Sequence, residues 1–367
     1  MKPCLDAKSR DRLTTLCKLG RLYDAEKLLV ERGTARLRKT RKWTPLMAAA
    51  CRGVHSLVEL LLRFDHAQWD LEKAHAGAIR HKRGDLAGMI LRSSWWSGEI
   101  DPVEALITGD TELVCKLVAS GVDFTKAPIV NNAALRSAWR TIKCLRAANI
   151  PLEAVEGQLY SALIAHAMEG HLQCVVHLLR AGLDPHKPVV WHEHADSEHD
   201  KMSAVRAAVF SHDPSLLAIL KPSPDKDDAE RLVGSTMWLG DRRMLLLLLD
   251  AGFSINSQKN GGSPALHDIL KTAGILGIRP DSRGQPPYDW ATFTADIEWL
   301  IRLGAKWVAK DNDDYRRIRD ALVKMGRTGA KSIVGMMLEG GAISESEVSE
   351  LLRTPRVRSI AASLGIR

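Results

Sequence analysis

The sequence predicts an all-α solenoid, a stack of helix-turn-helix repeats of similar length. Glycines recur as pairs twelve residues apart, and an apolar segment of helical periodicity lies between the members of each pair. These units recur at a mean interval of about 34 residues. Two longer stretches, near residues 185–203 and 271–289, are polar or proline-containing and are expected to be loop insertions. A single repeat cannot bury its apolar face alone, so the stack is the expected folding unit.

The spacing of the glycines predicts where each second helix begins and ends. Between one pair, Leu172, Val175 and Leu179 lie on one face of a helix. Each segment is expected to end on a left-handed residue, a conformation that glycine adopts most easily and asparagine next, as at Asn149. The glycine pairs are Gly109 and Gly121, Gly170 and Gly182, Gly240 and Gly252, and Gly329 and Gly341. Weaker copies start at Gly20, Gly53, Gly84, Ser137, Asp213 and Thr292, giving about ten repeats.

Three segments carry a resemblance to a known family. Residues 44–49 read TPLMAA and are followed by a glycine at position 53, which resembles the start of an ankyrin repeat. Residues 251–267 are similar to the end, turn and start of successive ankyrin repeats, and residues 181–185, AGLDP, are a third match. The spaced Trp, Gly, Tyr, Ala and Pro pattern of tetratricopeptide repeats is not seen. The chain therefore resembles the ankyrin family over roughly residues 10–341, and residues 342–367 are expected to form a C-terminal helical cap.

Local chemistry supports these segments. Thr44 is expected to cap the first helix of its repeat, with Pro45 at a position that needs no amide hydrogen. Ser344 and Glu347 fit a capping box at the start of the C-terminal cap. The sequence departs from the family at Met47, which replaces the usual histidine, and at 95–96, where two tryptophans stand in place of a glycine.

The resemblance implies a non-catalytic module that binds another protein through a concave face of finger-like turns and first helices. The residues expected to contact the partner lie at turn tips or just before corner glycines; they are Trp43, Arg52, Glu169, Trp238 and Asn260. Trp238 is the strongest candidate anchor, because tryptophan is enriched among residues that dominate binding energy. Trp139 is expected in the core, and Lys116, on an outward second helix, is expected to matter little.

The positive charge of the chain lies at its N-terminal end. Residues 1–50 contain 13 Lys and Arg against 5 Asp and Glu, which equals the net charge of +8 for the whole chain. The predicted turn between the first two repeats carries Arg36, Arg38, Lys39, Arg41 and Lys42. This turn is either a solvated loop or a patch for an anionic partner, an acidic protein surface or nucleic acid. No nucleic-acid motif supports the last choice, and a nucleic-acid-associated adaptor stays as the alternative function.

The insertion at 191–200, WHEHADSEHD, is the one candidate for metal chemistry in the sequence, with His186 nearby. Its spacing matches no closed zinc site and no cysteine joins it, so we expect neither a bound metal nor a cofactor there. A metal-dependent enzyme using this insertion is the weaker alternative. Phosphate-loop, dinucleotide, nucleophile-elbow, zinc-protease and kinase motifs are all absent from the sequence, and we expect no enzymatic activity.

The six cysteines form no C-x-x-C pair and are expected to be small buried hydrophobes in a reducing compartment. No apolar run reaches the roughly 18 residues of a membrane-spanning helix, and the first twelve residues have no apolar core of a signal peptide. The expected location is the cytoplasm, with no membrane contact.

Overall fold

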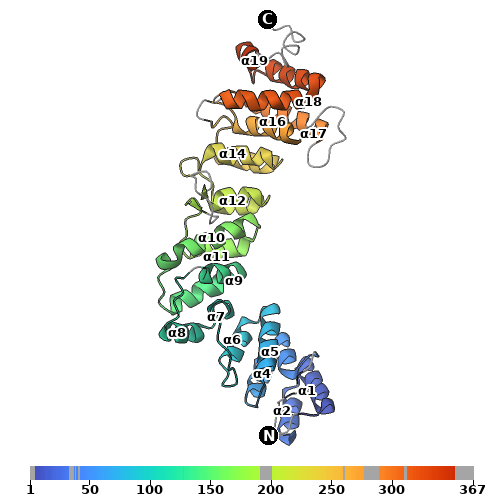
Figure 1. The fold of residues 1–367 in the computed structure, drawn as a ribbon, viewed down its shortest axis with the longest axis vertical. Helices are drawn as coiled ribbons and strands as arrows, with labels where there is room; N and C mark the ends of the chain where they lie inside the picture. Colours follow the sequence, from blue (N-terminus) through green and yellow to red (C-terminus); the bar gives the residue numbers. More distant parts are fainter. Residues whose placement is uncertain are drawn as a thin grey trace. The chain divides into compact units, whose positions relative to one another are not determined.

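The computed structural model describes residues 5–32, 37, 39, 42–126, 128–190, 201–258, 261–276, 289–309 and 312–351. These residues are mostly helical, and turns and loops join the helices (Figure 1). The strands among the described residues are β1 (Val189–Val190) and β2 (Lys201–Met202), which pair antiparallel. The prediction of a helical fold is confirmed.

The chain divides into two compact units, residues 1–163 with 173–183, and residues 164–172 with 184–367. In the first unit, consecutive helices pack in pairs. The first helices of successive pairs also contact one another: α1 contacts α3, and α3 contacts α5. The helices are α1 (Ala7–Leu19) and α2 (Leu22–Arg32), α3 (Pro45–Arg52) and α4 (His55–Leu62), α5 (Gln68–Arg80) and α6 (Gly84–Leu91), and α7 (Pro102–Thr108) and α8 (Thr111–Ala119). They are followed by α9 (Ile129–Ala147), which is kinked at Ser137, and by η1 (Leu152–Val155). The division between the units falls within α10 (Glu156–Met168) and at the start of α11 (Leu172–Arg180).

The second unit repeats the same local plan. The first helices α12, α14, α16 and α18 contact one another in chain order, and Figure 1 shows them as successive layers. The pairs are α12 (Ala204–Phe210) and α13 (Pro214–Leu220), α14 (Ala229–Trp238) and α15 (Arg242–Asp250), and α16 (Pro264–Leu276) and α17 (Trp290–Arg302). They are followed by α18 (Asn312–Glu339), broken by a non-helical residue at Gly326, and α19 (Glu345–Leu351).

The predicted left-handed residues are confirmed at most corners and helix ends. Asn149 has φ 54°, as its place at a helix end required. The same region is occupied by Gly20, Gly53, Gly109, Gly121, Gly170, Gly182, Gly240, Gly252, Gly304 and Gly341. Each of these glycines therefore ends or turns a helix where the sequence pattern placed it.

Two corners lie two or three residues before the positions that the sequence predicted. Lys82, with φ 60°, turns the chain after α5, and Gly84 instead begins α6. A Cβ atom at Gly84 would lie 2.6 Å from the carbonyl oxygen of Thr108, so the glycine serves close packing there. In α18 the non-helical residue is Gly326, with φ 77°, and Gly329 is helical.

One predicted insertion begins too early. Residues 271–276 continue α16, because Leu270 and Ala273 are buried and extend its apolar face. Residues 277–288 and 191–200 of the two predicted insertions lie outside the described residues. The capping box before α19 is confirmed: the Ser344 N–H donates to Glu347 Oε2 at 2.8 Å, and the Glu347 N–H donates to Ser344 Oγ at 3.3 Å.

The cysteines only partly follow their prediction. Cys17 and Cys144 are buried, and burial raises the pKa of each thiol to about 12. Cys115, in contrast, is exposed on α8. Among the described residues, no helix is both long and apolar enough to cross a membrane.

Candidate protein-interaction surface

The turn before α3 presents an aromatic ring among cations. Lys39 and Lys42 are exposed, and Trp43 is 43% exposed. The Lys18 ammonium lies 5.1 Å from the centre of the Trp43 ring, within the range of a cation–π contact. The other basic residues of this turn, Arg36, Arg38 and Arg41, lie outside the described residues.

Helix α3 is built as its sequence predicts. The Met47 N–H donates to Thr44 Oγ1 at 3.1 Å, Pro45 occupies the first turn, and the alanines that follow are buried. Arg52 ends the helix and is exposed, immediately before the left-handed Gly53. Trp43 and Arg52 therefore flank a helix of eight residues, about 12 Å long.

The family model of the ankyrin repeat matches residues 41–73. Residues 41–73 form an ankyrin repeat. This repeat contains α3, α4 and the first part of α5, and Trp43 and Arg52 belong to it. No curated protein matches the chain.

A pocket of about 410 Å³ lies beside the ankyrin repeat, on the side of the first helices. Its walls come from α5, the end of α6, α7, the first half of α9 and the segment at 92–101 that links α6 to α7. Ile79, Leu91 and Trp96 supply apolar surface, and both signs of charge line it. The charged residues are Arg80, Glu99, Asp101, Glu104 and Arg136.

Two ring nitrogens are buried in this pocket without a hydrogen-bond partner. They are His75 Nε2 and Trp96 Nε1, and the two rings meet edge to face with centroids 5.8 Å apart. Burial lowers the pKa of His75, an effect that Glu104 opposes and Arg136 reinforces. Glu104 Oε2 is 4.0 Å from His75 Nε2, and Glu104 Oε1 is 2.5 Å from Arg136 Nη1. The His75 ring is therefore favoured in its neutral form, and Glu104 is engaged by the guanidinium.

Of the two tryptophans noted in the sequence, Trp96 lines this pocket. Helix α6 ends on Arg92 in a right-handed conformation, so the segment continues without the usual left-handed glycine. Trp95 Nε1 donates to the Leu62 carbonyl oxygen at 3.0 Å, which ties the segment to the end of α4. Trp96 is thereby directed to the pocket beside His75.

The expected core position of Trp139 is wrong. Its side chain is 48% exposed, because the buried stripe of this half of α9 runs through Ala138, Ile142 and Leu145. Trp139 is one residue, or about 100° around the helix, away from that stripe. It lines a groove of about 650 Å³, with the charged ends of Arg140 and Lys143 each 5.9 Å from its ring.

The carboxylates of that groove are already engaged within the chain. Arg92 pairs with Asp110 at 2.8 Å and with Glu112 at 2.6 Å, and Lys116 holds the other oxygen of Glu112 at 2.8 Å. Contacts with Lys116 first, and with Arg92, lower the pKa of Glu112. Lys116 is exposed on the second helix α8, as expected.

The remaining predicted contact residues belong to the second unit or are not described. Glu169 is exposed directly before Gly170, where its carboxylate meets His171. Trp238 is the last residue of α14, and its side chain lies outside the description, as does the whole of Asn260. Of the predicted contact set, the structure places Trp43 in the turn before α3 and Arg52 at the last residue of α3. No motif in the sequence points to His75 or to the pocket around it.

Proposed function

We propose that the chain is a non-catalytic protein-binding module whose partner docks on the turns and first helices. Ankyrin repeats generally mediate interactions between proteins, and residues 41–73 form one. The observation that carries the proposal is the pocket beside that repeat, where His75 Nε2 and Trp96 Nε1 are buried without partners.

The chemistry of these two nitrogens fits a polypeptide. A buried polar group without a hydrogen bond costs about 1–3 kcal/mol. The indole nitrogen of Trp96 is only a donor, so its partner must be an acceptor such as a backbone carbonyl oxygen. The apolar wall and the mixed charge at the rim suit the apolar centre and polar margin of a protein interface.

The same proposal extends to the rest of the chain. The helix pairs outside residues 41–73 are diverged ankyrin repeats, about ten in all, and the partner lies along their concave face. The proposed contacts include Trp43, Arg52, Glu169, Trp238 and Asn260. The basic turn, with Arg36, Arg38, Lys39, Arg41 and Lys42, faces an acidic part of the partner.

Comparative capture tests the proposal. Immobilised wild type, Trp96→Phe, Trp43→Ala and Lys116→Ala are incubated with extract of the native organism, and bound proteins are quantified by mass spectrometry. Trp96→Phe keeps an aromatic ring and removes the donor, and Lys116→Ala is the control on an outward helix. We expect one protein retained by wild type and Lys116→Ala and depleted in both tryptophan variants. A set of bound proteins that is the same for all four folded baits contradicts the proposal.

The concentration of positive charge in residues 1–50 favours nucleic acid as the alternative partner. Gel-shift titrations of RNA and DNA across a salt series separate the two, using wild type and a variant with all five basic-turn residues changed to Ser. The protein-binding proposal predicts no saturable complex at physiological salt. A saturable complex that weakens steeply with salt and is lost in the Ser variant would instead support the adaptor function.

A further inference from the structure

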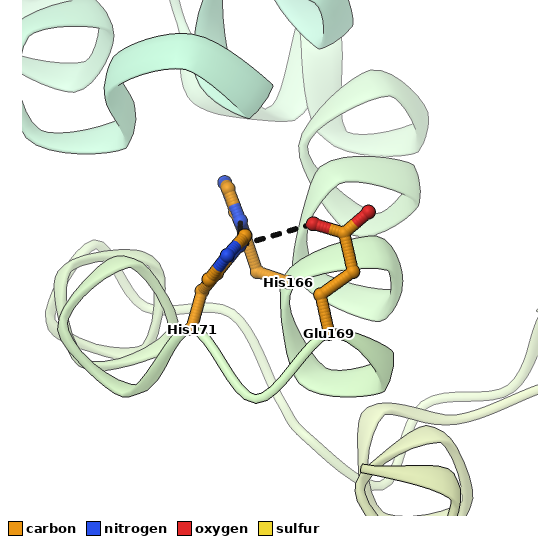
Figure 2. A group of neighbouring side chains, drawn as sticks. All are labelled: His166, Glu169 and His171. Carbon is orange, nitrogen blue, oxygen red and sulfur yellow. Dashed lines mark hydrogen bonds and ion pairs between the residues drawn. The ribbon is translucent and has the colours of Figure 1, made fainter.

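The corner between α10 and α11 gathers three side chains that can bind a metal ion. His166 lies in the last turn of α10, Glu169 follows the helix, and His171 precedes α11. One ligand atom from each residue lies within 4.8 Å of the other two. Figure 2 shows the side chains converging over the turn, with the carboxylate of Glu169 reaching toward the His171 ring.

The backbone of the corner brings the two histidines together, with their ring centroids 5.3 Å apart and the rings meeting edge to face. Gly170 has φ 74°, the Gly170 N–H donates to the Ala167 carbonyl oxygen, and the His171 N–H donates to the His166 carbonyl oxygen at 2.9 Å. These bonds form a Schellman motif, which brings the side chain after the glycine against the side chain five residues earlier. The position of the imidazoles therefore follows from the helix ending and does not depend on a flexible loop.

Other corners use the same hydrogen bond with different side chains. The bond joins Arg21 to Leu16, Val54 to Ala49, Arg83 to Ala78 and Asp241 to Thr236. In none of these four pairs do both residues carry a good metal-binding atom, whereas at the α10–α11 corner both are histidines and a glutamate stands beside them. The helix ending alone therefore does not require two histidines and a glutamate at this corner.

Two of the three distances between ligand atoms are close to the spacing of ligands around zinc. The Nδ1 atoms of His166 and His171 are 3.1 Å apart, and His171 Nδ1 is 3.1 Å from Glu169 Oε2. A tetrahedral zinc ion with ligands at about 2.0–2.2 Å separates them by roughly 3.3–3.5 Å. Two imidazole nitrogens and a carboxylate oxygen are also ligands that zinc accepts.

One ligand of the site is buried and the other two are exposed, so the site is ordered and an ion can still reach it. His166 is 2% exposed, so its ring is fixed by the surrounding helices. The side chains of His171 and Glu169 are 53% and 62% exposed and can adjust by a few tenths of an ångström around an entering ion. Three protein ligands leave the fourth position of a tetrahedron to water.

We infer that His166, Glu169 and His171 form a binding site for one zinc ion at the α10–α11 corner. This site is separate from the His-rich insertion, where we expect no metal. It shares Glu169 with the proposed partner contacts, but zinc binding requires no second protein and is measured without one.

The test uses untagged, full-length protein stripped of metal and titrated with zinc chloride by calorimetry, with elemental analysis after dialysis. We expect about one zinc ion per chain. His171→Asn and Glu169→Gln should each weaken binding roughly tenfold or more, as the loss of a ligand costs at least as much as that of an outer-shell partner. Both side chains are exposed, so these variants retain the fold.

A variant with His192→Asn and His194→Asn in the insertion is the matched control and should bind zinc as the wild type does. Zinc should also raise the thermal midpoint of the wild type and of this control by more than that of His171→Asn, because an ion that binds more weakly stabilises the native state less. The inference is overturned by the absence of stoichiometric binding, by binding that His171→Asn and Glu169→Gln leave intact, or by binding that the insertion variant abolishes.

Discussion

His75 shows how the burial of one side chain can link stability to pH. Its ring lies in the pocket beside Trp96, and burial holds its pKa below the ordinary value of 6.5. As the pH falls through 6.5, the unfolded chain takes up the proton more readily than the folded chain does. The contribution of this residue to stability is therefore complete above that pH and is lost progressively below it.

Replacing His75 with Phe removes the titrating group and retains a ring against Trp96. We expect the free energy of unfolding to fall less between about pH 7 and pH 5 in His75→Phe than in the wild type. Urea denaturation at several pH values measures the difference. Identical pH dependence of the two proteins would show that His75 is protonated as easily in the folded state as in the unfolded one.

The residues that sequence reasoning identified are those whose role is local. A left-handed glycine and a threonine cap each depend on a few neighbouring atoms, and Gly53 and Thr44 were placed correctly. Trp139 was misplaced because one position around a helix separates the core from solvent, and the kink at Ser137 sets that rotation. The pairing of His166 with His171 does have a signal in the sequence, namely two histidines five residues apart across a corner glycine.

At the scale of the helix, each second helix has a narrow buried stripe. In α11, Val175 and Leu178 are fully buried, while Gln173 is exposed. The predicted apolar face is confirmed at Val175, which has no exposed surface. Because neighbouring helices cover that stripe, a charge placed on it would lose its water without gaining a partner.

Val175→Asp should therefore destabilise the protein by roughly 3 kcal/mol or more. Gln173→Asp introduces the same group on the exposed face of the same helix and should change stability by no more than about 0.5 kcal/mol. Thermal and urea unfolding of both variants provide the comparison. Equal stability of the two would mean that the buried face of α11 has been assigned incorrectly.

For the whole molecule, the periodic glycines predicted the helical fold, since helix endings recur along a chain of similar units. The pocket at His75 and Trp96 was not predictable in the same way. It is lined by four helices, α5, α6, α7 and α9, and by the segment at 92–101, where the chain leaves α6 without a left-handed glycine. This segment follows α6 and lies beyond the matched residues 41–73.

Calorimetry with the purified partner tests the central claim most directly. Once capture has identified that protein, its affinity is measured for the wild type and for Trp43→Ala, Trp96→Phe, Trp238→Ala and Lys116→Ala. Trp43→Ala and Trp238→Ala should each reduce the binding free energy by roughly 2 kcal/mol or more, with the larger loss for Trp238→Ala. Trp96→Phe removes a single hydrogen-bond donor and should reduce the binding free energy by about 1 kcal/mol. Lys116→Ala should stay within about 0.5 kcal/mol of the wild type. If all four folded variants bind as the wild type does, or if Lys116→Ala alone loses affinity, the partner does not dock on the turns and first helices.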